Sequence, residues 1–247
     1  MKTREILKKS NFIIFLPMQN KDSKIFISGG GSEKDSYLLD KEFVDEIVAM
    51  RKGSVLYIPL AMEEDRYASC YDWIINSLMD ITEEFIDIEM WTNLDNKTLD
   101  DLKKFSAIYI GGGNTFKLLQ HIYNSNFSDV LMEYINEGGI VYGGSAGAII
   151  LGKNINTVPE ENDADYKHEK GLSIIGEYSI ICHYQENLDA NIGQYLVLYN
   201  NPVIALSEKT GLVISGKKAR VAGSAPAVIF DINGKKNILD VGRDFLF

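Results

Sequence analysis

The segment Ile140-Val-Tyr-Gly-Gly-Ser-Ala-Gly-Ala148 decides the fold, because a short apolar run leads straight into a glycine-rich turn. Its centre, Gly143-Gly-Ser-Ala-Gly147, fits the pattern G-x-S-x-G, in which small neighbours let a strand turn sharply into a helix. The same design occurs upstream, where Ala107-Ile-Tyr-Ile110 runs into Gly111-Gly-Gly-Asn-Thr115. Both segments predict a buried strand with a glycine turn at its carboxyl end.

Strand-like and helix-like patterns alternate on the amino-terminal side of these two turns. Lys24 to Ser28 reads as a first strand that ends in three glycines, and it precedes a helical periodicity over 37–50 and a buried strand over 54–60. Such alternation predicts an α/β fold with a doubly wound, mostly parallel sheet flanked by helices. The remaining elements expected here are helices near 67–78, 99–105, 116–122 and 127–136, and strands near 85–90, 107–110 and 140–142.

The pattern changes after Gly152. A polar and acidic stretch over 157–171 reads as a surface loop, and strand-like runs return at 178–182 and 203–206. We expect residues 1–23 to be an N-terminal extension and residues 24–247 to form a single domain. Further apolar runs at 211–216, 219–222 and 227–230 predict a C-terminal antiparallel β meander.

The composition narrows the possible partners. The chain has 247 residues, of which 45% are hydrophobic, so it can bury a sizeable core. With 25 Lys and Arg against 35 Asp and Glu, the net charge of −10 would repel a phosphate backbone, so we expect no nucleic acid partner. We find no apolar run long enough to cross a membrane, and we expect a cytoplasmic protein without a membrane contact.

Ser145 is the candidate nucleophile. A G-x-S-x-G turn exposes the hydroxyl at the end of the sheet and places the amide of Ala146 at a helix N-terminus, where it can donate to an oxyanion. A second amide, from Gly112 or Gly113, could face it from the other glycine turn. The short motif also fits a simple tight connection or a phosphate-binding loop, and the pattern alone does not choose between these.

The candidate base is His183, which follows the strand-like run at 178–182. The other two histidines, His121 and His168, fall in a predicted helix and in the polar stretch, and we expect both at the surface. A buried histidine satisfied by backbone groups is the alternative for His183. Glu208 and the acidic cluster at 160–165 compete as the acceptor for the second ring nitrogen, and spacing alone cannot choose between them.

The paired motifs, Gly111-Gly-Gly-Asn-Thr-Phe-Lys-Leu-Leu119 and Gly143-Gly-Ser-Ala-Gly-Ala148, resemble the dipeptidase E and cyanophycinase family of serine peptidases. The resemblance extends from about residue 24 to 231. It implies a fold like that of class I glutamine amidotransferases and hydrolysis of short peptides through an acyl-enzyme. The roles it implies are Ser145 as nucleophile, His183 as general base, Glu208 as orienting acid with Glu160 in reserve, amides around Gly113 and Ala146 as oxyanion hole, and Asn114 and Thr115 beside the substrate.

One feature of the resembling family is missing. Members that remove an N-terminal aspartate carry an arginine-containing stretch after the histidine, whereas this chain has no arginine between His183 and Asn201. That interval contains two acids, Glu186 and Asp189, from which we derive the hypothesis that the substrate pocket favours a cationic group.

Two other functions remain open at this point. An esterase of the α/β-hydrolase type would use the same Ser145 with an acid before the histidine, which requires Glu160, Asp163 or Asp165. A catalytically inactive, ligand-binding domain is the second alternative, and the missing arginine stretch favours it. No metal-ligand spacing and no cofactor motif is present, so we expect neither a metal nor a cofactor, and a monomer and a homodimer are both compatible with the sequence.

Overall fold

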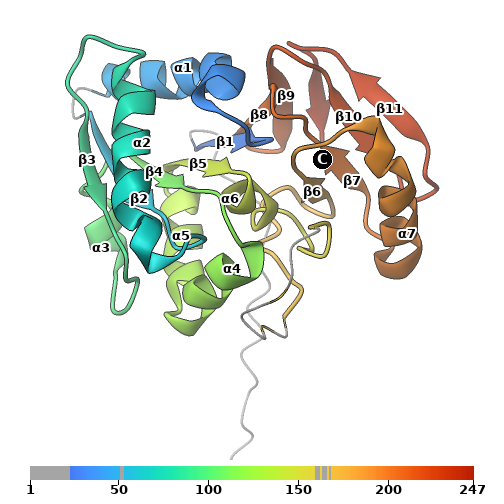
Figure 1. Ribbon diagram of the computed structural model, residues 1–247, viewed down its shortest axis with the longest axis horizontal. Coiled ribbons are helices and arrows are strands. Elements are labelled where there is room, and N and C mark those ends of the chain that lie inside the picture. Colours follow the sequence, from blue (N-terminus) through green and yellow to red (C-terminus); the bar gives the residue numbers. More distant parts are fainter. Residues whose placement is uncertain (1–22, 51–52, 159–161, 163–165, 167) are drawn as a thin grey trace, which may run out of the picture.

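The computed structural model describes residues 23–50, 53–158, 162, 166 and 168–247. The expected N-terminal extension, apart from Ser23, lies outside these residues. Eight of the described strands form a main sheet in the order β12-β9-β8-β1-β5-β4-β2-β3, in which β1, β5, β4, β2 and β3 run parallel (Figure 1). The predicted α/β fold with a mostly parallel sheet is therefore confirmed. The bounds of these strands are β1 Lys24–Ser28, β2 Ser54–Ile58, β3 Asp87–Met90, β4 Ala107–Ile110, β5 Ile140–Gly144, β8 Thr210–Ser215, β9 Lys218–Gly223 and β12 Asp244–Leu246.

Helices cover both faces of the main sheet because its strands alternate buried side chains between the two faces. Phe26 of β1 packs with α1 and α2 on one face, while Ile25 and Ile27 pack with α3 to α6 on the other. Each face is apolar, as expected for a parallel sheet that is buried on both sides. The helices are α1 Glu33–Ala49, α2 Tyr67–Met79, α3 Leu99–Leu102, α4 Thr115–Asn124, α5 Phe127–Asn136 and α6 Ala146–Ile149.

A second sheet lies beside the first, with the strand order β11-β10-β7-β6. Ile180, Ile204 and Ile229 belong to the same apolar cluster as the main sheet, whereas Ile181 and Val203 pack with a further helix, α7. Figure 1 shows α7 beside this second sheet. The second sheet is thus held between the main core and α7. Its elements are β6 Ser179–Ile181, α7 Asp189–Tyr199, β7 Val203–Ala205, β10 Ala227–Phe230 and β11 Lys236–Leu239.

Two expectations about the C-terminal third need correction. The strands there do pair antiparallel, but they do not form a single meander: β8 and β9 extend the main sheet, and β10 pairs with β7 in the second sheet. Helix α7 was not expected from the sequence. Its signal was present in the spacing of Leu188, Ile192 and Tyr195, which face the second sheet together.

A carboxylate is buried under the main sheet. Asp40 of α1 is 3% exposed and accepts hydrogen bonds from the Tyr142 hydroxyl (2.5 Å) and the Ser36 hydroxyl (2.6 Å). Tyr142 also stacks on Tyr109, with ring centroids 4.3 Å apart. Burial raises the pKa of Asp40 to about 6, although the two hydrogen bonds act in the opposite direction.

The raised pKa predicts a specific pH dependence of stability. Because the folded state binds the Asp40 proton more tightly than the unfolded state, this group stabilises the fold most below about pH 4. That contribution falls as the pH rises to about 6, by about 3 kcal/mol in total. Asp40→Asn removes this slope, so urea unfolding between pH 4.5 and 7.5 should show the variant gaining stability relative to wild type as the pH rises.

Asp45→Asn is the matched control, because Asp45 lies on the same helix with its side chain 62% exposed. It should keep the wild-type slope. Parallel pH profiles for wild type and Asp40→Asn would contradict the assignment of the slope to Asp40.

Candidate active site

Three glycine turns meet at one edge of the main sheet. Gly29–Gly31 follow β1, Gly111–Gly113 follow β4, and Gly143 and Gly144 end β5. Since β4, β5 and β1 are neighbouring parallel strands, their carboxyl ends lie side by side. This edge is where an open α/β sheet binds ligands.

The Ser145 backbone is held in an uncommon conformation. Its φ of 49° and ψ of −110° place a non-glycine residue at positive φ, directly before α6. The flanking glycines permit this turn: a Cβ on Gly147 would lie 2.2 Å from the Ile110 carbonyl oxygen, and one on Gly143 would lie 2.5 Å from that of Gly147. The G-x-S-x-G pattern therefore reflects backbone contacts that exclude any side chain at its two ends.

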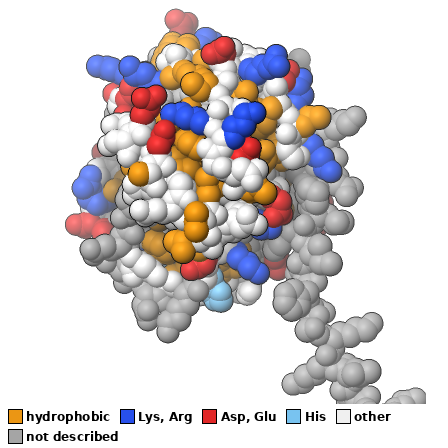
Figure 2. All heavy atoms as spheres, turned by 90° about the vertical axis from the view of Figure 1, so that its right-hand side faces the viewer, with side chains coloured by type: hydrophobic (Ala, Val, Ile, Leu, Met, Phe, Trp, Pro, Cys, Tyr) orange, Lys and Arg blue, Asp and Glu red, His pale blue; other side chains and the backbone are white. Residues whose placement is uncertain are grey.

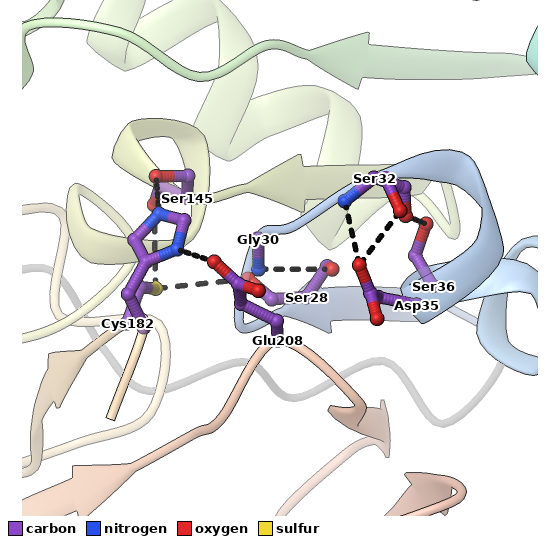
Figure 3. Close-up of polar contacts among 9 residues, drawn as sticks. Ser28, Gly30, Ser32, Asp35, Ser36, Ser145, Cys182 and Glu208 are labelled. Carbon is purple, nitrogen blue, oxygen red and sulfur yellow. Dashed lines mark hydrogen bonds and ion pairs between the residues drawn. The ribbon is translucent and has the colours of Figure 1, made fainter. Parts of the chain in front are cut away.

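Ser145, His183 and Glu208 form a continuous hydrogen-bonded row (Figure 3). Ser145 Oγ lies 2.9 Å from His183 Nε2, and His183 Nδ1 lies 2.9 Å from Glu208 Oε1. The histidine follows β6, and the glutamate lies in the turn between β7 and β8. The side chains of His183 and Glu208 are 49% and 50% exposed, so the row is open to solvent.

The glycine turn that follows β1 packs directly against His183 and Glu208. A Cβ on Gly30 would lie 2.3 Å from His183 Cε1, and one on Gly31 would lie 2.7 Å from Glu208 Cβ. The Gly29 carbonyl accepts a hydrogen bond from the His183 amide at 2.9 Å. From the sequence, these glycines were expected only to end the first strand. Their role in the site could have been inferred because they repeat the pattern of the other two strand-end glycine turns.

The other predicted site residues lie at different distances from the row. Gly112 is next to Ser145, since a Cβ there would lie 3.6 Å from Ser145 Oγ, whereas Gly113, at φ 133°, lies against the Ala61 carbonyl. Asn114 Oδ1 accepts the Lys117 amide at 3.0 Å and so caps α4. Thr115 is fully buried, so the structure does not bring it to the surface of the site. Ala146 begins α6, and the reserve acid Glu160 lies outside the described residues.

Two cavities adjoin the row, and His183 contributes to the walls of both. The smaller, of about 220 Å³, also has Ser145 and Gly112 in its walls, with Tyr57, Trp73 and Tyr109 as aromatic surfaces. The larger, of about 430 Å³, lies between α7 and the strands of the second sheet. Both cavities are therefore next to the histidine of the row.

The structure corrects the hypothesis of an acidic substrate pocket. Glu186 and Asp189 both pair with Lys236, at 3.6 Å and 3.0 Å, and Asp189 also accepts the Tyr184 hydroxyl at 2.7 Å. Neither acid is a wall residue of the two cavities. Lys236 compensates one of the two negative charges, and neither carboxylate faces a cavity, so the charge argument for a cationic substrate loses its basis.

The remaining histidines stand apart from the row: His121 is half-buried on α4 and His168 is exposed, and neither contributes to the two cavities. In the described part of the chain, no group of three or more His, Cys, Asp or Glu side chains could hold a metal ion. No described helix is both long and apolar enough to cross a membrane.

Comparison with known proteins identifies the family. The model of peptidase family S51 matches residues 25–222. The chain belongs to peptidase family S51. It is therefore a serine peptidase that acts on peptides, as the resemblance of its two motifs predicted.

Individual relatives of this S51 peptidase agree with the match. Peptidase E of Pasteurella multocida is 26% identical over 235 residues, which cover 90% of this chain and 97% of that protein. A "Probable alpha-aspartyl dipeptidase" of Drosophila melanogaster is 28% identical over 157 residues, which cover 59% of this chain and 65% of that protein. The crystal structure of a peptidase from an acI-B1 Actinobacterium has the same fold, with a TM-score of 0.72 at 21% identity, covering 95% of this chain and all of that one.

The contact between Gly30 and His183 yields a test of the site geometry. Gly30→Ala would place a methyl group against the imidazole at a backbone φ of 97°, which displaces the ring from Ser145. A displacement of this kind lowers the reactivity of the serine by about 100-fold or more. The measurement is the rate at which a fluorophosphonate probe labels Ser145.

Gly193→Ala is the control, because a Cβ at this α7 position meets nothing within 4 Å. It should label at the wild-type rate and raise the free energy of unfolding by about 0.5–1 kcal/mol. Equal labelling of the Gly30→Ala and Gly193→Ala proteins would show that the glycine turn does not position His183.

Proposed function

We propose that this S51 peptidase hydrolyses short peptides through an acyl-enzyme on Ser145, with His183 as general base and Glu208 as the acid that orients the imidazole. The observation that carries the proposal is the row of two 2.9 Å contacts, Ser145 Oγ to His183 Nε2 and His183 Nδ1 to Glu208 Oε1. Each side chain in this row has the partner that its role requires.

The proposed reaction begins when Ser145 Oγ attacks the peptide carbonyl carbon and its proton passes to His183 Nε2. The carbonyl oxygen becomes an oxyanion, and the C–N bond breaks as His183 returns the proton to the leaving amine. Water then attacks the acyl-enzyme with the same proton transfer, which releases the acid product and restores the Ser145 hydroxyl. Glu208 accepts the hydrogen bond from Nδ1–H throughout and stabilises the imidazolium.

The proposed oxyanion hole consists of backbone amides from the two glycine turns. Ala146 is the first residue of α6, so its amide points out of the helix N-terminus. Gly112 lies next to Ser145 at the end of β4, where a Cβ would be 3.1 Å from the serine Cβ, and Gly113 follows it in the same turn. Two such donors aimed at the developing charge are worth about 10²- to 10³-fold each.

Other properties belong to the same proposal. The partner is a small peptide rather than a nucleic acid, which the net charge of −10 supports, and the enzyme acts in the cytoplasm as a monomer or homodimer. Residues 24–247 form one domain preceded by the extension 1–23. Asn114, which caps α4, lies beside the substrate in this proposal, whereas the fully buried Thr115 does not.

Labelling with a fluorophosphonate probe tests the nucleophile and the base. Wild type should carry an adduct that peptide mass mapping places on Ser145, and Ser145→Ala should carry none. His183→Ala should slow the labelling by about 10³-fold or more, because the hydroxyl loses its base. An adduct that forms equally fast without His183 would exclude the proposed role of this histidine.

The choice of acid has its own test. Glu208→Gln should slow labelling by about 10²- to 10⁴-fold, because the amide cannot hold the imidazolium as a carboxylate does. Glu160→Gln, which changes the reserve acid in the same way, should label like wild type. The reverse pattern, with a large loss only at residue 160, would assign the role to Glu160 and favour the acid-before-histidine order of an esterase.

A further inference from the structure

The larger cavity beside His183 is mainly apolar. It has a volume of about 430 Å³, which lies in the usual range for small-molecule sites. Its walls come from four parts of the fold: the end of α6, the loop at 156–158, the strands β6 and β7 with the residues that follow β6, and the face of α7. Apolar wall residues from these parts include Ile149, Ile181, Leu188, Ile192, Tyr195 and Val203.

Among the described residues, the cavity wall contains no aspartate, glutamate, lysine or arginine. His183 is the one histidine among these described wall residues. Several polar groups in the wall already have partners, since the Thr157 hydroxyl donates to the Ile180 carbonyl at 2.5 Å and the Asn156 amide donates to the Tyr199 hydroxyl at 2.9 Å. A charged substrate group would lose its hydration here without gaining a counter-ion.

The cavity adjoins the proposed base. His183 is a wall residue of both cavities, and its Nε2 lies 2.9 Å from the Ser145 hydroxyl. A side chain in the larger cavity therefore belongs to a residue next to the bond that Ser145 attacks. The outer surface of α7 is itself partly apolar, with Leu198 both 75% exposed and in the cavity wall, and hydrophobic side chains are spread over this side of the molecule (Figure 2).

We infer that this cavity is the specificity pocket of the enzyme and that it takes a large apolar side chain, of the leucine or phenylalanine type, from a residue adjoining the scissile bond. The inference rests on the proposed function, because it needs Ser145 as the attacking group. It also explains why no arginine is needed between His183 and Asn201, because an apolar substrate side chain has no carboxylate to pair with. This stretch includes α7, and α7 supplies apolar wall residues where a substrate carboxylate would need a cation.

Dipeptide hydrolysis by the full-length enzyme tests the inference. Two sets, X-Ala and Ala-X, are compared with X as Ala, Leu, Phe, Asp or Lys. In one of the two sets, Leu and Phe at position X should raise kcat/KM over Ala by about 10- to 100-fold. The set that shows this preference identifies whether the pocket binds the residue before or after the scissile bond. Asp and Lys in that set should fall below Ala.

A variant in the cavity wall connects this preference to the pocket. Gln194 is an exposed wall residue on α7, so Gln194→Arg adds a cation at the mouth of the cavity with little effect on folding. It should raise the Asp/Phe ratio of kcat/KM by about tenfold or more. Val197→Arg is the matched control, because Val197 is 84% exposed on the same helix and is not a wall residue. It should leave the ratio at the wild-type value.

Each result is decisive when Ser145 labelling is measured on the same preparation. A labelled enzyme that cleaves Asp or Lys peptides as well as Leu and Phe peptides, or cleaves no Leu or Phe peptide, overturns the inference while the proposed function stands. Equal shifts in Gln194→Arg and Val197→Arg also overturn it, since they show a general charge effect. Failure to label Ser145 at all contradicts the proposed function itself.

Discussion

The carboxyl edge of the main sheet depends on backbone contacts that leave no space for side chains. A Cβ on Gly147 would lie 2.2 Å from the Ile110 carbonyl oxygen, and one on Gly30 would lie 2.3 Å from the His183 ring. Because β1, β5 and β4 are adjacent, these contacts bring three strand ends and the second sheet together at one point. The positive φ of Ser145 is tolerated there because Gly143, Gly144 and Gly147 have no side chains to clash, and the serine hydroxyl lies 2.9 Å from His183 Nε2.

Chemistry and specificity come from different parts of this architecture. The row from Ser145 to Glu208 lies at the junction of the two sheets, with the His183 and Glu208 side chains half-exposed, so in the proposed function it is open to any peptide bond that reaches it. In this proposal, the walls of the two cavities determine which substrate side chains are accepted. Aromatic rings from the main sheet and α2 line the smaller cavity, and α7 and the second sheet line the larger one. Changes in α7 can therefore alter the accepted side chain without disturbing the serine, because α7 packs on the second sheet rather than on the glycine turns.

The sequence predicted what local patterns determine and missed what tertiary pairing determines. The strand-turn-helix motifs at Gly111 and Gly143 located the edge and the family, because both depend on short-range backbone geometry. Whether β10 would follow β9 or pair with β7 depends on contacts between distant segments, so the expected single meander was corrected. The pairing of Glu186 and Asp189 with Lys236, some 50 residues later in the chain, was invisible for the same reason. Spacing also could not select Glu208 over Glu160, whereas the 2.9 Å contact with His183 Nδ1 supports Glu208.

The central claim is that Glu208 acts on the serine only through His183, and a double-mutant cycle measures this most directly. Rates of peptide hydrolysis and of Ser145 labelling are determined for wild type, His183→Ala, Glu208→Gln and the double variant. Residues that act as a unit are not additive, so we predict that Glu208→Gln slows wild type by orders of magnitude but has no further effect once His183 is alanine. A double variant whose loss equals the product of the two single losses would contradict the account, because it would mean that Glu208 contributes by a route that does not pass through His183.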